Sequence, residues 1–445
     1  MGRYFGTDGI RGVANVDLTP ELVFRVGRAA GAELRGEGGL FFVGRDSRLS
    51  GPMLEAALAA GLCSTGASVE LGGLLPTPAV AYLARMRGAA VGVVISASHN
   101  PVEDNGIKFF GGDGYKLLDA HEEAIEALLD RDDLPRPSGT AIGTIRAVPE
   151  AEGRYLEYLM GLALAPLRGV RVVVDCAYGA AARLAPRLWE ALGSTVIPLH
   201  AEPDGSRINV QCGSTHLEPL RAAVLAEGAD LGFAHDGDAD RVLAVDEQGN
   251  EVDGDAIMGM CALDRHRRGV LPASTVVATV MSNAGLERAL QAVGIRMERT
   301  RVGDRYVLER MRQIGAALGG EQSGHIVFLD RATTGDGLLT AIEVTNVMTR
   351  TGKRLSELRA AIPRFPQVLR NVRVADRNDI MDAPEVVRAV AAAQDRLAGR
   401  GRILVRPSGT EPLVRIMVEA EGQDEAEAIA AEVAEVIRRR FGEPP

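Results

Sequence analysis

Short apolar runs alternate with segments of helical spacing along the first part of the chain. Between residues 40 and 130, the apolar stretches 41–43 and 89–95 alternate with helix-like segments at 51–66 and 120–130. This alternation is typical of strands and helices arranged as βα units around a sheet. The pattern therefore predicts an α/β fold.

The alternation stops between residues 130 and 150, where Pro135, Pro137, Gly139 and Gly143 interrupt any helical spacing. Proline and glycine at this density favour turns and loops. We interpret this stretch as a linker or surface crossing and place the first domain boundary there.

The pattern resumes with the apolar run 170–174, which predicts a buried parallel strand. A glycine turn at Gly179 and a helix to about Gly193 follow it, and the runs 231–234 and 242–245 predict two more strands. These elements form a second unit.

A third unit follows the polar, glycine-bearing stretch 246–255. It contains predicted strands at 275–280 and 326–329 and a predicted helix near 286–293. No repeat at the level of single residues relates this unit to the first two.

Pro363 and Pro366 break the chain again before a smaller fourth unit. Its last helix has apolar residues at i, i+4, i+7 and i+8 counted from Ile429, the spacing of an amphipathic helix. The expected architecture is three successive similar mixed α/β domains and a smaller C-terminal α+β domain. Their predicted bounds are 1–150, 151–252, 253–366 and 367–445.

Composition and charge exclude several classes of protein. Apolar residues make up 46% and charged residues 25% of the 445 positions, close to the averages of folded globular proteins. The net charge of −10, without a block of like charge, argues against general binding to nucleic acid or anionic lipid. The chain has only three lysines, of which Lys108 lies within a motif discussed below.

The four cysteines are spread singly, with no CxxC spacing, which suits free thiols in a reducing compartment rather than a zinc site. The N-terminus has no apolar signal segment, and the longest apolar run, 89–95, is far shorter than the ~20 residues that span a bilayer. We therefore expect a cytoplasmic protein that is neither exported nor inserted in a membrane.

A cluster of small and hydrogen-bonding side chains, 96–101, follows the apolar run 89–95. Ligands bind at the carboxyl ends of strands in α/β sheets, so this cluster is a candidate site. Ser98 is a candidate nucleophile, but no GxSxG elbow surrounds it, and His99 is not placed as its base by being next in sequence. A turn that ends a strand is the alternative reading.

Three carboxylates, Asp236, Asp238 and Asp240, alternate in the loop between two predicted strands, and such a trio favours a hard cation. Glu247 stands at the twelfth position of a calcium-binding EF-hand loop, but Arg241 occupies the sixth, where that loop needs glycine. A strand also follows where a helix is required. A solvated acidic turn is the remaining alternative, weakened by the mutual repulsion of the trio.

A phosphorylated Ser98 would carry a charge of about −2. Adding the three aspartates and one Mg²⁺ leaves about −3, so the site also needs cations, and the motifs offer Arg241, Lys108 and Arg11. Mg²⁺ bridging a phosphoryl oxygen and carboxylates acts as a Lewis acid in phosphoryl transfer.

Two further loops suit ligand binding. In the loop 320–325, Glu321 and Ser323 alternate and could hold sugar hydroxyls, while a buried His325 is more often structural than catalytic. The loop 406–412 suits a phosphate, because arginine offers a planar fork and hydroxyl and backbone groups add neutral donors. Its candidate residues are Arg406, Ser408, Gly409, Thr410 and, beyond it, Arg415.

The chain has neither a GxGxxG nor a GxxxxGK[ST] motif, so neither a dinucleotide-binding fold nor a P-loop is supported. Phosphate chemistry without ATP is the expectation that remains.

These motifs resemble those of the α-D-phosphohexomutases, and within them the bacterial phosphoglucosamine mutases. The resemblance spans the chain and is carried by five segments in the family's order: FGTDGIRG at 5–12, ISASHNP at 95–101 with DNGIK at 104–108, DGDADR at 236–241, GEQSGH at 320–325 and RPSGTEP at 406–412. The opening segment, Gln322, GDRY at 303–306 and the chain length favour the narrower group.

The resemblance implies interconversion of glucosamine 6-phosphate and glucosamine 1-phosphate, a step toward UDP-N-acetylglucosamine and cell-wall precursors. Ser98 would carry the phosphoryl group, one Mg²⁺ per chain would be held by that phosphate with Asp236, Asp238 and Asp240, and a hexose or glucosamine 1,6-bisphosphate would be primer and intermediate.

The resemblance also implies four domains around a central active-site cleft. Glu321 and Ser323 would hold sugar hydroxyls, and the loop that begins at Arg406 would hold the non-reacting phosphate. For the general acid and base, Lys108, His325 and His99 stay open. Sugar phosphates are the expected partners, and a homodimer is compatible with the sequence.

Three rival functions stay open at this stage. A phosphomannomutase or phosphoglucomutase would share Ser98 and the acidic loop, a metal-dependent sugar phosphatase would release free phosphate, and a sugar-phosphate or calcium sensor would not need Ser98.

Overall fold

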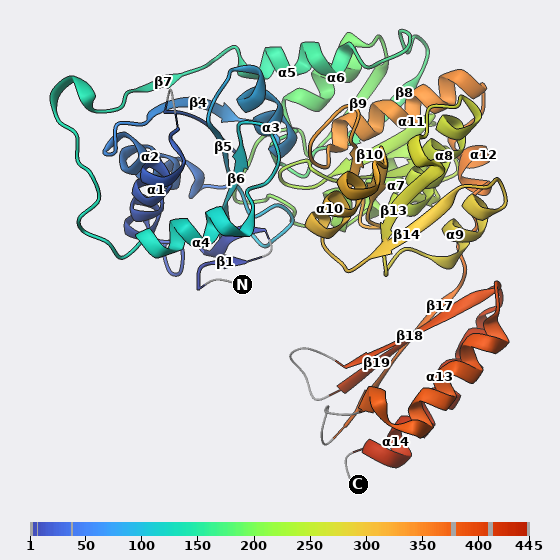
Figure 1. The fold of residues 1–445 in the computed structure, drawn as a ribbon. Helices are drawn as coiled ribbons and strands as arrows, with labels where there is room; N and C mark the ends of the chain where they lie inside the picture. Colours follow the sequence, from blue (N-terminus) through green and yellow to red (C-terminus); the bar gives the residue numbers. More distant parts are fainter. Residues whose placement is uncertain (1–2, 7, 37–38, 375–379, 408–412, 443–445) are drawn as a thin grey trace. The chain divides into compact units, whose positions relative to one another are not determined.

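In the part of the chain that it describes, the computed structural model forms four β-sheets with helices packed around them (Figure 1). The chain divides into two compact units: Met1–Met281 with Glu298–Arg359, and Ser282–Met297 with Ala360–Pro445. The structure describes residues 3–6, 8–36, 39–374, 380–407 and 413–442.

The first sheet has seven strands in the order β1-β2-β6-β5-β3-β4-β7. Strand β3 is parallel to β4 and β5, and β7 is parallel to β4, whereas β1, β2 and β6 pair antiparallel. The strands are β1 (Phe5–Gly6), β2 (Gly9–Val13), β3 (Leu40–Arg45), β4 (Ser68–Leu74), β5 (Val91–Ile95), β6 (Asp104–Gly111) and β7 (Ile145–Ala147).

The predicted strand in 89–95 is β5, and all five of its residues are buried. Alternate side chains of β3 explain the two covered faces of this sheet: Phe41 and Val43 join the core formed with α1, α2 and α4, while Gly44 leaves room for Val80 of α3. The helices are α1 (Pro20–Leu34), α2 (Gly51–Cys63), α3 (Thr77–Met86) and α4 (Asp119–Leu128).

The stretch 130–150 is not structureless. Most of its residues are exposed, as in a surface crossing, but it contains the short helix η1 (Gly139–Ala141) and strand β7, which pairs with β4 and forms the edge of the sheet. All three residues of β7 are exposed, so no apolar pattern marks it in the sequence.

The second sheet has five strands in the order β12-β11-β10-β8-β9. Strands β9, β8 and β10 are parallel, while β11 and β12 are antiparallel. The run 170–174 was expected to be a buried parallel strand and is β8, whereas no strand was predicted at β9. Its strands and helices are β8 (Arg171–Asp175), β9 (Thr195–Leu199), β10 (Leu231–His235), β11 (Val242–Asp246), β12 (Glu251–Val252), α5 (Ala151–Met160), α6 (Leu184–Ala191), η2 (Gly213–Thr215) and α7 (Glu218–Glu227).

Both faces of this sheet are covered by apolar side chains. Trp189 of α6 stacks on Phe233 of β10 with ring centroids 5.3 Å apart, and Leu220 and Val224 of α7 pack with Val173 of β8. Because both faces of the sheet are covered, the loops after the carboxyl ends of β8 and β10 are the places where this sheet can meet a ligand.

The third sheet has the order β14-β13-β15-β16. Strand β13 is parallel to β15, and β15 is antiparallel to β16. Its strands and the helices near them in the chain are α8 (Gly254–Arg267), η3 (Pro272–Ser274), β13 (Thr275–Thr279), β14 (Arg296–Thr300), α10 (Asp304–Ile314), β15 (Leu318–Gly320), β16 (Ile326–Phe328), α11 (Gly337–Thr351) and α12 (Leu355–Ala360). The helix α9 (Ala284–Gln291), between β13 and β14 in the chain, belongs to the second compact unit.

The fourth sheet is antiparallel, in the order β17-β19-β18, and belongs to the second compact unit with its own apolar core. Ile429 and Val433 of the predicted last helix are buried in that core. The elements are β17 (Gln367–Arg373), η4 (Ile380–Asp382), α13 (Pro384–Leu397), β18 (Gly401–Pro407), β19 (Leu413–Ala420) and α14 (Gln423–Phe441).

No helix in the described part of the chain is both long and apolar enough to cross a membrane.

Candidate active site

Ser98 lies in the loop that follows β5, and it is buried. Its Oγ donates a hydrogen bond to Asp236 Oδ2 at 2.6 Å and lies 3.2 Å from His99 Nδ1. Its backbone is left-handed, with φ of 52°, a conformation that is uncommon for a residue other than glycine. Ser98 is thus held beside the acidic loop of the second sheet.

The acidic loop joins β10 to β11, and Asp236, Asp238 and Asp240 are all buried. One oxygen of each carboxylate lies within 4.8 Å of the corresponding oxygens of the other two. The Oδ1 atoms of Asp238 and Asp240 are buried without a hydrogen-bond partner. Buried orphan carboxylate oxygens beside a third carboxylate fit a hard divalent cation, which prefers oxygen ligands.

Lys108 extends from β6 into this acidic group. Its Nζ lies 3.0 Å from Asp238 Oδ2, 3.2 Å from Asp8 Oδ2 and 3.7 Å from Asp240 Oδ2. Burial by itself lowers the pKa of Lys108, but the carboxylates outweigh burial and raise it, Asp238 most of all. Lys108 is therefore a fixed positive charge within the carboxylates.

The carboxylates of the loop differ in proton affinity. Burial and the charges of its two neighbours raise the pKa of Asp236 well above its ordinary value. Burial also opposes the charged form of Asp238, but Lys108 and the hydroxyl of Thr77, which donates to Asp238 Oδ2 at 2.6 Å, hold its pKa below the ordinary range. The nearby ammonium of Lys108 thus sets Asp238 apart from Asp236.

A cavity of about 410 Å³ opens beside Ser98. Seven of the residues proposed from sequence line it: Arg11, Ser98, His99, Asp240, Arg241, Glu321 and His325. The sequence analysis gave no site role to the other seven: Tyr4, Gly6, Asp8, Gly9, Val302, Gly303 and Asp304. A cavity of this size suits a small polar ligand such as a sugar phosphate.

The two candidate histidines differ in their surroundings. Burial, followed by the nearby Arg241 and Arg11 charges, lowers the pKa of His99 to about 4, so its ring is neutral at pH 7. Neither ring nitrogen of the buried His325 has a hydrogen-bond partner, and Nε2 lies 3.7 Å from Asp304 Oδ2 and 4.0 Å from Asp240 Oδ2. His325 is thus available to a ligand in the cavity.

Of the other proposed ligand-binding residues, Arg11 donates to Asn100 Oδ1 at 2.8 Å and pairs with Asp8. Glu321 Oε1 accepts from the backbone N–H of Gly303 at 3.1 Å. Ser323 is exposed and does not line the cavity with Glu321.

The proposed phosphate-binding residues belong to the second compact unit. Arg406 of β18 stands opposite Arg415 of β19 in the strand register, so the two arginines are neighbours at one end of the hairpin. Ser408, Gly409 and Thr410 lie outside the described residues.

An ion-pair chain that the sequence analysis did not identify joins two walls of the cavity. Lys116 Nζ pairs with both Asp8 and Asp304, and Asp8 pairs in turn with Arg11 and Lys108. Lys116 is another of the three lysines, and that scarcity was the signal that could have identified it.

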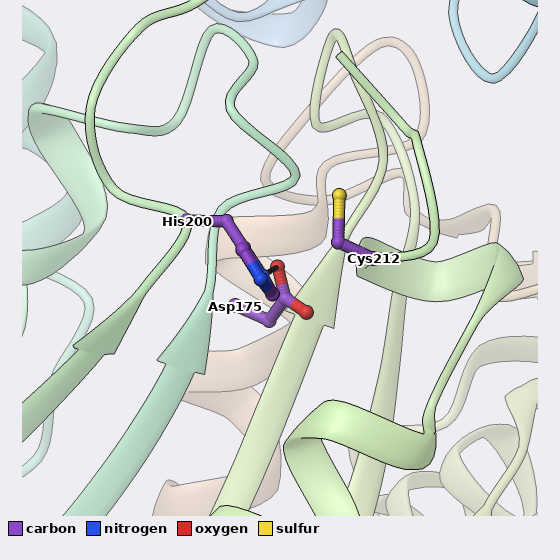
Figure 2. Close-up of side chains that lie close together, drawn as sticks. All are labelled: Asp175, His200 and Cys212. Carbon is purple, nitrogen blue, oxygen red and sulfur yellow. Dashed lines mark hydrogen bonds and ion pairs between the residues drawn. The ribbon is translucent and has the colours of Figure 1, made fainter. Parts of the chain in front are cut away.

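A second cluster of potential metal ligands, Asp175, His200 and Cys212, lies at the carboxyl end of β8 (Figure 2). Asp175 already accepts hydrogen bonds from the backbone of Ala177 and Gly213 and lies 3.0 Å from His200 Nδ1. Burial, followed by the Asp175 charge, raises the pKa of Cys212 to about 12, so its thiol is protonated at pH 7. The hydrogen bonds give this cluster a structural role in joining loops.

Comparison with known protein families places four models of one family in order along the chain. They are the alpha/beta/alpha domains I, II and III and the C-terminal domain of the phosphoglucomutase/phosphomannomutase family, matching residues 2–136, 154–249, 253–365 and 369–436.

A curated relative, the phosphoglucosamine mutase of Moorella thermoacetica, is 58% identical over 97% of this chain and 98% of its own length. Among solved structures, a phosphoglucomutase/phosphomannomutase family protein from Burkholderia thailandensis has a TM-score of 0.81 at 27% identity, covering 97% of each chain.

A more distant structure, the N-acetylphosphoglucosamine mutase of Aspergillus fumigatus in complex with GlcNAc-6P and magnesium, shares the fold. Its TM-score is 0.65 at 20% identity, covering 98% of this chain and 95% of that one. With Ser98, the acidic loop and the cavity in place, and with sequence identity over nearly its whole length, the chain belongs to the phosphoglucosamine mutase family, bacterial enzymes of the phosphohexomutase superfamily.

Proposed function

We propose that the chain interconverts glucosamine 6-phosphate and glucosamine 1-phosphate, with Ser98 as the residue that carries the transferred phosphoryl group. The observation that carries this proposal is the position of Ser98 Oγ, 2.6 Å from Asp236 Oδ2 at the edge of the 410 Å³ cavity. The name of the Moorella relative supports the amino sugar as substrate.

The proposed reaction has two transfers that balance each other. In the first, the bond between phosphorus and Ser98 Oγ breaks while phosphorus bonds to the sugar hydroxyl, which loses its proton. The resulting 1,6-bisphosphate reorients in the cavity. The bond between its other phosphorus and the sugar oxygen then breaks, and that phosphoryl group is transferred to Ser98 Oγ. The hydroxyl left on the sugar takes up a proton, so the enzyme ends as it began.

Asp236, Asp238 and Asp240 would hold one Mg²⁺ together with the Ser98 phosphate. The orphan Oδ1 atoms of Asp238 and Asp240 are suited to this role. When bound, the cation supplies Lewis-acid stabilisation of charge on the transferring phosphoryl group. The Aspergillus relative was solved with magnesium and a sugar phosphate, which supports the same cation here.

The protons of the two transfers need a group close to the sugar hydroxyl. His325 suits this role best, because it lines the cavity and neither ring nitrogen is engaged. Lys108 is held in ion pairs with Asp238 and Asp8, so we assign it to charge balance. His99, neutral at pH 7 and 3.2 Å from Ser98 Oγ, would orient the serine.

The cations Arg11 and Arg241 would face the phosphoryl group, and Glu321 with Ser323 would face sugar hydroxyls. The loop with Arg406, Ser408, Gly409 and Thr410, together with Arg415, would hold the phosphate that is not reacting. Because this loop would bind whichever phosphate is not reacting, the same contacts would hold the bisphosphate in both of its orientations.

We further propose four domains at 1–150, 151–252, 253–366 and 367–445, supported by the four matched segments. The expected location is the cytoplasm, and the expected partners are sugar phosphates, with a homodimer allowed. A hexose or glucosamine 1,6-bisphosphate would prime the unphosphorylated enzyme.

The test is isomerisation of glucosamine 6-phosphate, glucose 6-phosphate and mannose 6-phosphate by one preparation, with Mg²⁺ and a bisphosphate primer. The amino sugar should turn over fastest, and Ser98→Ala should abolish turnover. Faster turnover of glucose or mannose phosphate would move the enzyme to a rival mutase, and release of free phosphate as the main product would make it a phosphatase.

A further inference from the structure

Arg48 is a completely buried arginine to which the proposed reaction gives no role. Each of its five N–H donors has an acceptor, which fills its hydrogen-bonding capacity. Nε donates to Asp46 Oδ2, and the two terminal nitrogens donate to four backbone carbonyls, those of Ser98, Asn100, Pro101 and Asp104. A single side chain thereby fixes the whole loop that carries Ser98.

The same network also reaches the other side of Ser98. Asp46, the partner of Arg48, accepts from Ser96 Oγ at 2.6 Å, and Ser96 Oγ accepts from the backbone N–H of Ser98 at 2.9 Å. The carbonyl of Ser98 accepts from Arg48 Nη2 at 3.0 Å and from Asn209 Nδ2 at 2.9 Å. Both backbone polar groups of Ser98 are therefore bound by side chains.

Such anchoring is needed because Ser98 has a left-handed backbone with φ of 52°. A residue other than glycine stays in this region only where its surroundings hold it there. In this conformation Ser98 Oγ points to Asp236 Oδ2, 2.6 Å away. If the loop relaxed to a right-handed or extended backbone, that direction would change.

We propose that Arg48 is a positioning residue that holds Ser98 in the left-handed conformation required for phosphoryl transfer. This inference rests on the proposed function of Ser98. Lysine cannot replace Arg48 fully, because one ammonium has three donors on a single atom and cannot reach five acceptors spread around a planar fork. The role is mechanical, since Arg48 does not itself line the cavity and contacts Ser98 at its backbone carbonyl rather than at Oγ.

The test compares Arg48→Lys with Arg28→Lys, which replaces another buried arginine, in α1. Arg48→Lys should lower kcat about 100-fold, the loss expected from a reacting atom displaced by about 1 Å. KM for the sugar phosphate should change less than about threefold, because the residues proposed to hold the sugar are untouched. Arg28→Lys should leave both constants near those of the unchanged enzyme.

Hydrogen exchange provides a readout that general destabilisation does not reproduce. The amides of residues 98–100 and 102–104 should exchange faster in Arg48→Lys, while those of β10 and β13 keep their protection. Loss of kcat with unchanged exchange at 98–104, or equal losses in both arginine variants, would overturn the proposal.

A second variant covers failure of Arg48→Lys to fold. Asn209→Gly removes the other donor to the Ser98 carbonyl, and its φ of 61° suits glycine without strain. It should lower kcat about 10-fold with KM unchanged, and an unaltered kcat would count against the proposed anchoring. If the unchanged enzyme isomerises no hexose phosphate, the proposed function fails, and exchange at 98–104 alone decides the role of Arg48.

Discussion

Single side chains balance the charge of this site. Asp236, Asp238 and Asp240 lie close together, and Lys108 offsets one of their charges. The remaining feature is the pair of orphan Oδ1 atoms, which a cation would complete. We therefore expect the protein to fold without the metal ion and to bind it mainly through these unpaired carboxylate oxygens.

The first prediction is that Asp238→Asn weakens Mg²⁺ binding at least about 10-fold, because it removes a charge and replaces one oxygen with an amide nitrogen. Isothermal titration of the unphosphorylated protein measures the affinity. Glu227→Gln, on the exposed face of α7, is the matched control and should bind as the unchanged protein does. Equal affinities for all three proteins would contradict the assignment of the metal site.

For single residues, the sequence identified those that stand in motifs but not the side chains that pair with them in the fold. Ser98 and the three aspartates stand in recognisable loops. Asp8 and Asp304, by contrast, are joined by Lys116, which is 108 residues from the first and 188 from the second. Arg48 gave no signal either, because a buried arginine looks in sequence like an exposed one. Such partners become visible only when the chain is folded.

At the scale of elements, two loops at strand ends must approach closely. The loop after β5 carries Ser98, and the loop after β10 carries Gly237, where an added methyl group would lie 2.6 Å from Ser98 O and 2.9 Å from Asn209 Nδ2. The absence of a side chain at Gly237 thus allows the loop of Ser98 to approach the loop of the aspartates.

We accordingly expect Gly237→Ala to separate these loops and lower kcat about 100-fold, since a displacement of about 1 Å suffices for that loss. Steady-state isomerisation kinetics measure it. Gly153→Ala is the control, because an added methyl group meets nothing within 4 Å there and alanine favours the helix α5. Full activity of Gly237→Ala would show that the close approach is not required.

The N-terminus of α11 provides a pH-dependent prediction. Asp336 caps this helix by accepting from Leu339 N, and it also accepts from the hydroxyl of Tyr155 at 2.6 Å. Burial outweighs these bonds and raises the pKa of Asp336 from 3.8 to about 6. Between these pH values the folded state binds more protons than the unfolded state. The contribution of this carboxyl group to the free energy of unfolding therefore falls as pH rises.

The expected result is that the free energy of unfolding falls, relative to Asp336→Asn, by at most about 1.4 kcal/mol per pH unit between pH 4 and 6. Urea titrations of both proteins at pH 4, 5, 6 and 7 measure the difference. Asp204→Asn is the control and should show almost no pH-dependent difference from pH 5 to 7, because hydrogen bonds from Ser206 and Arg207 lower the pKa of Asp204 to about 2, well below this range. A difference independent of pH would mean that Asp336 titrates normally.

Elements were predictable where both faces of a strand are buried. The apolar residues of β5, β8 and β13 identified those strands, because buried parallel strands have nearly continuous apolar runs. The pattern missed β14, whose sequence RMERT is mostly polar, and the exposed β7. In both, pairing with a neighbouring strand outweighs the local sequence pattern.

For the whole molecule, the fold class followed from the alternation of apolar runs and helices, and the family from five loops in order. The amino sugar did not follow from residue chemistry, because Ser98 and the aspartates serve any hexose phosphate. The first compact unit holds Ser98, the acidic loop and the cavity, while Arg406 and Arg415 belong to the second. Specificity for one hexose phosphate depends on the side chains around the sugar, so it cannot be derived from the loop that carries Ser98.

In the proposed mechanism, Ser98 carries the phosphoryl group in an enzyme that isomerises an amino sugar phosphate. Intact-protein mass with peptide mapping, before and after incubation with a hexose 1,6-bisphosphate, tests it most directly when joined to the isomerisation assay on the same sample. We expect one phosphate on Ser98 and fastest turnover of glucosamine 6-phosphate. Turnover without phosphate on Ser98, or no isomerisation by the fully phosphorylated protein, would contradict it.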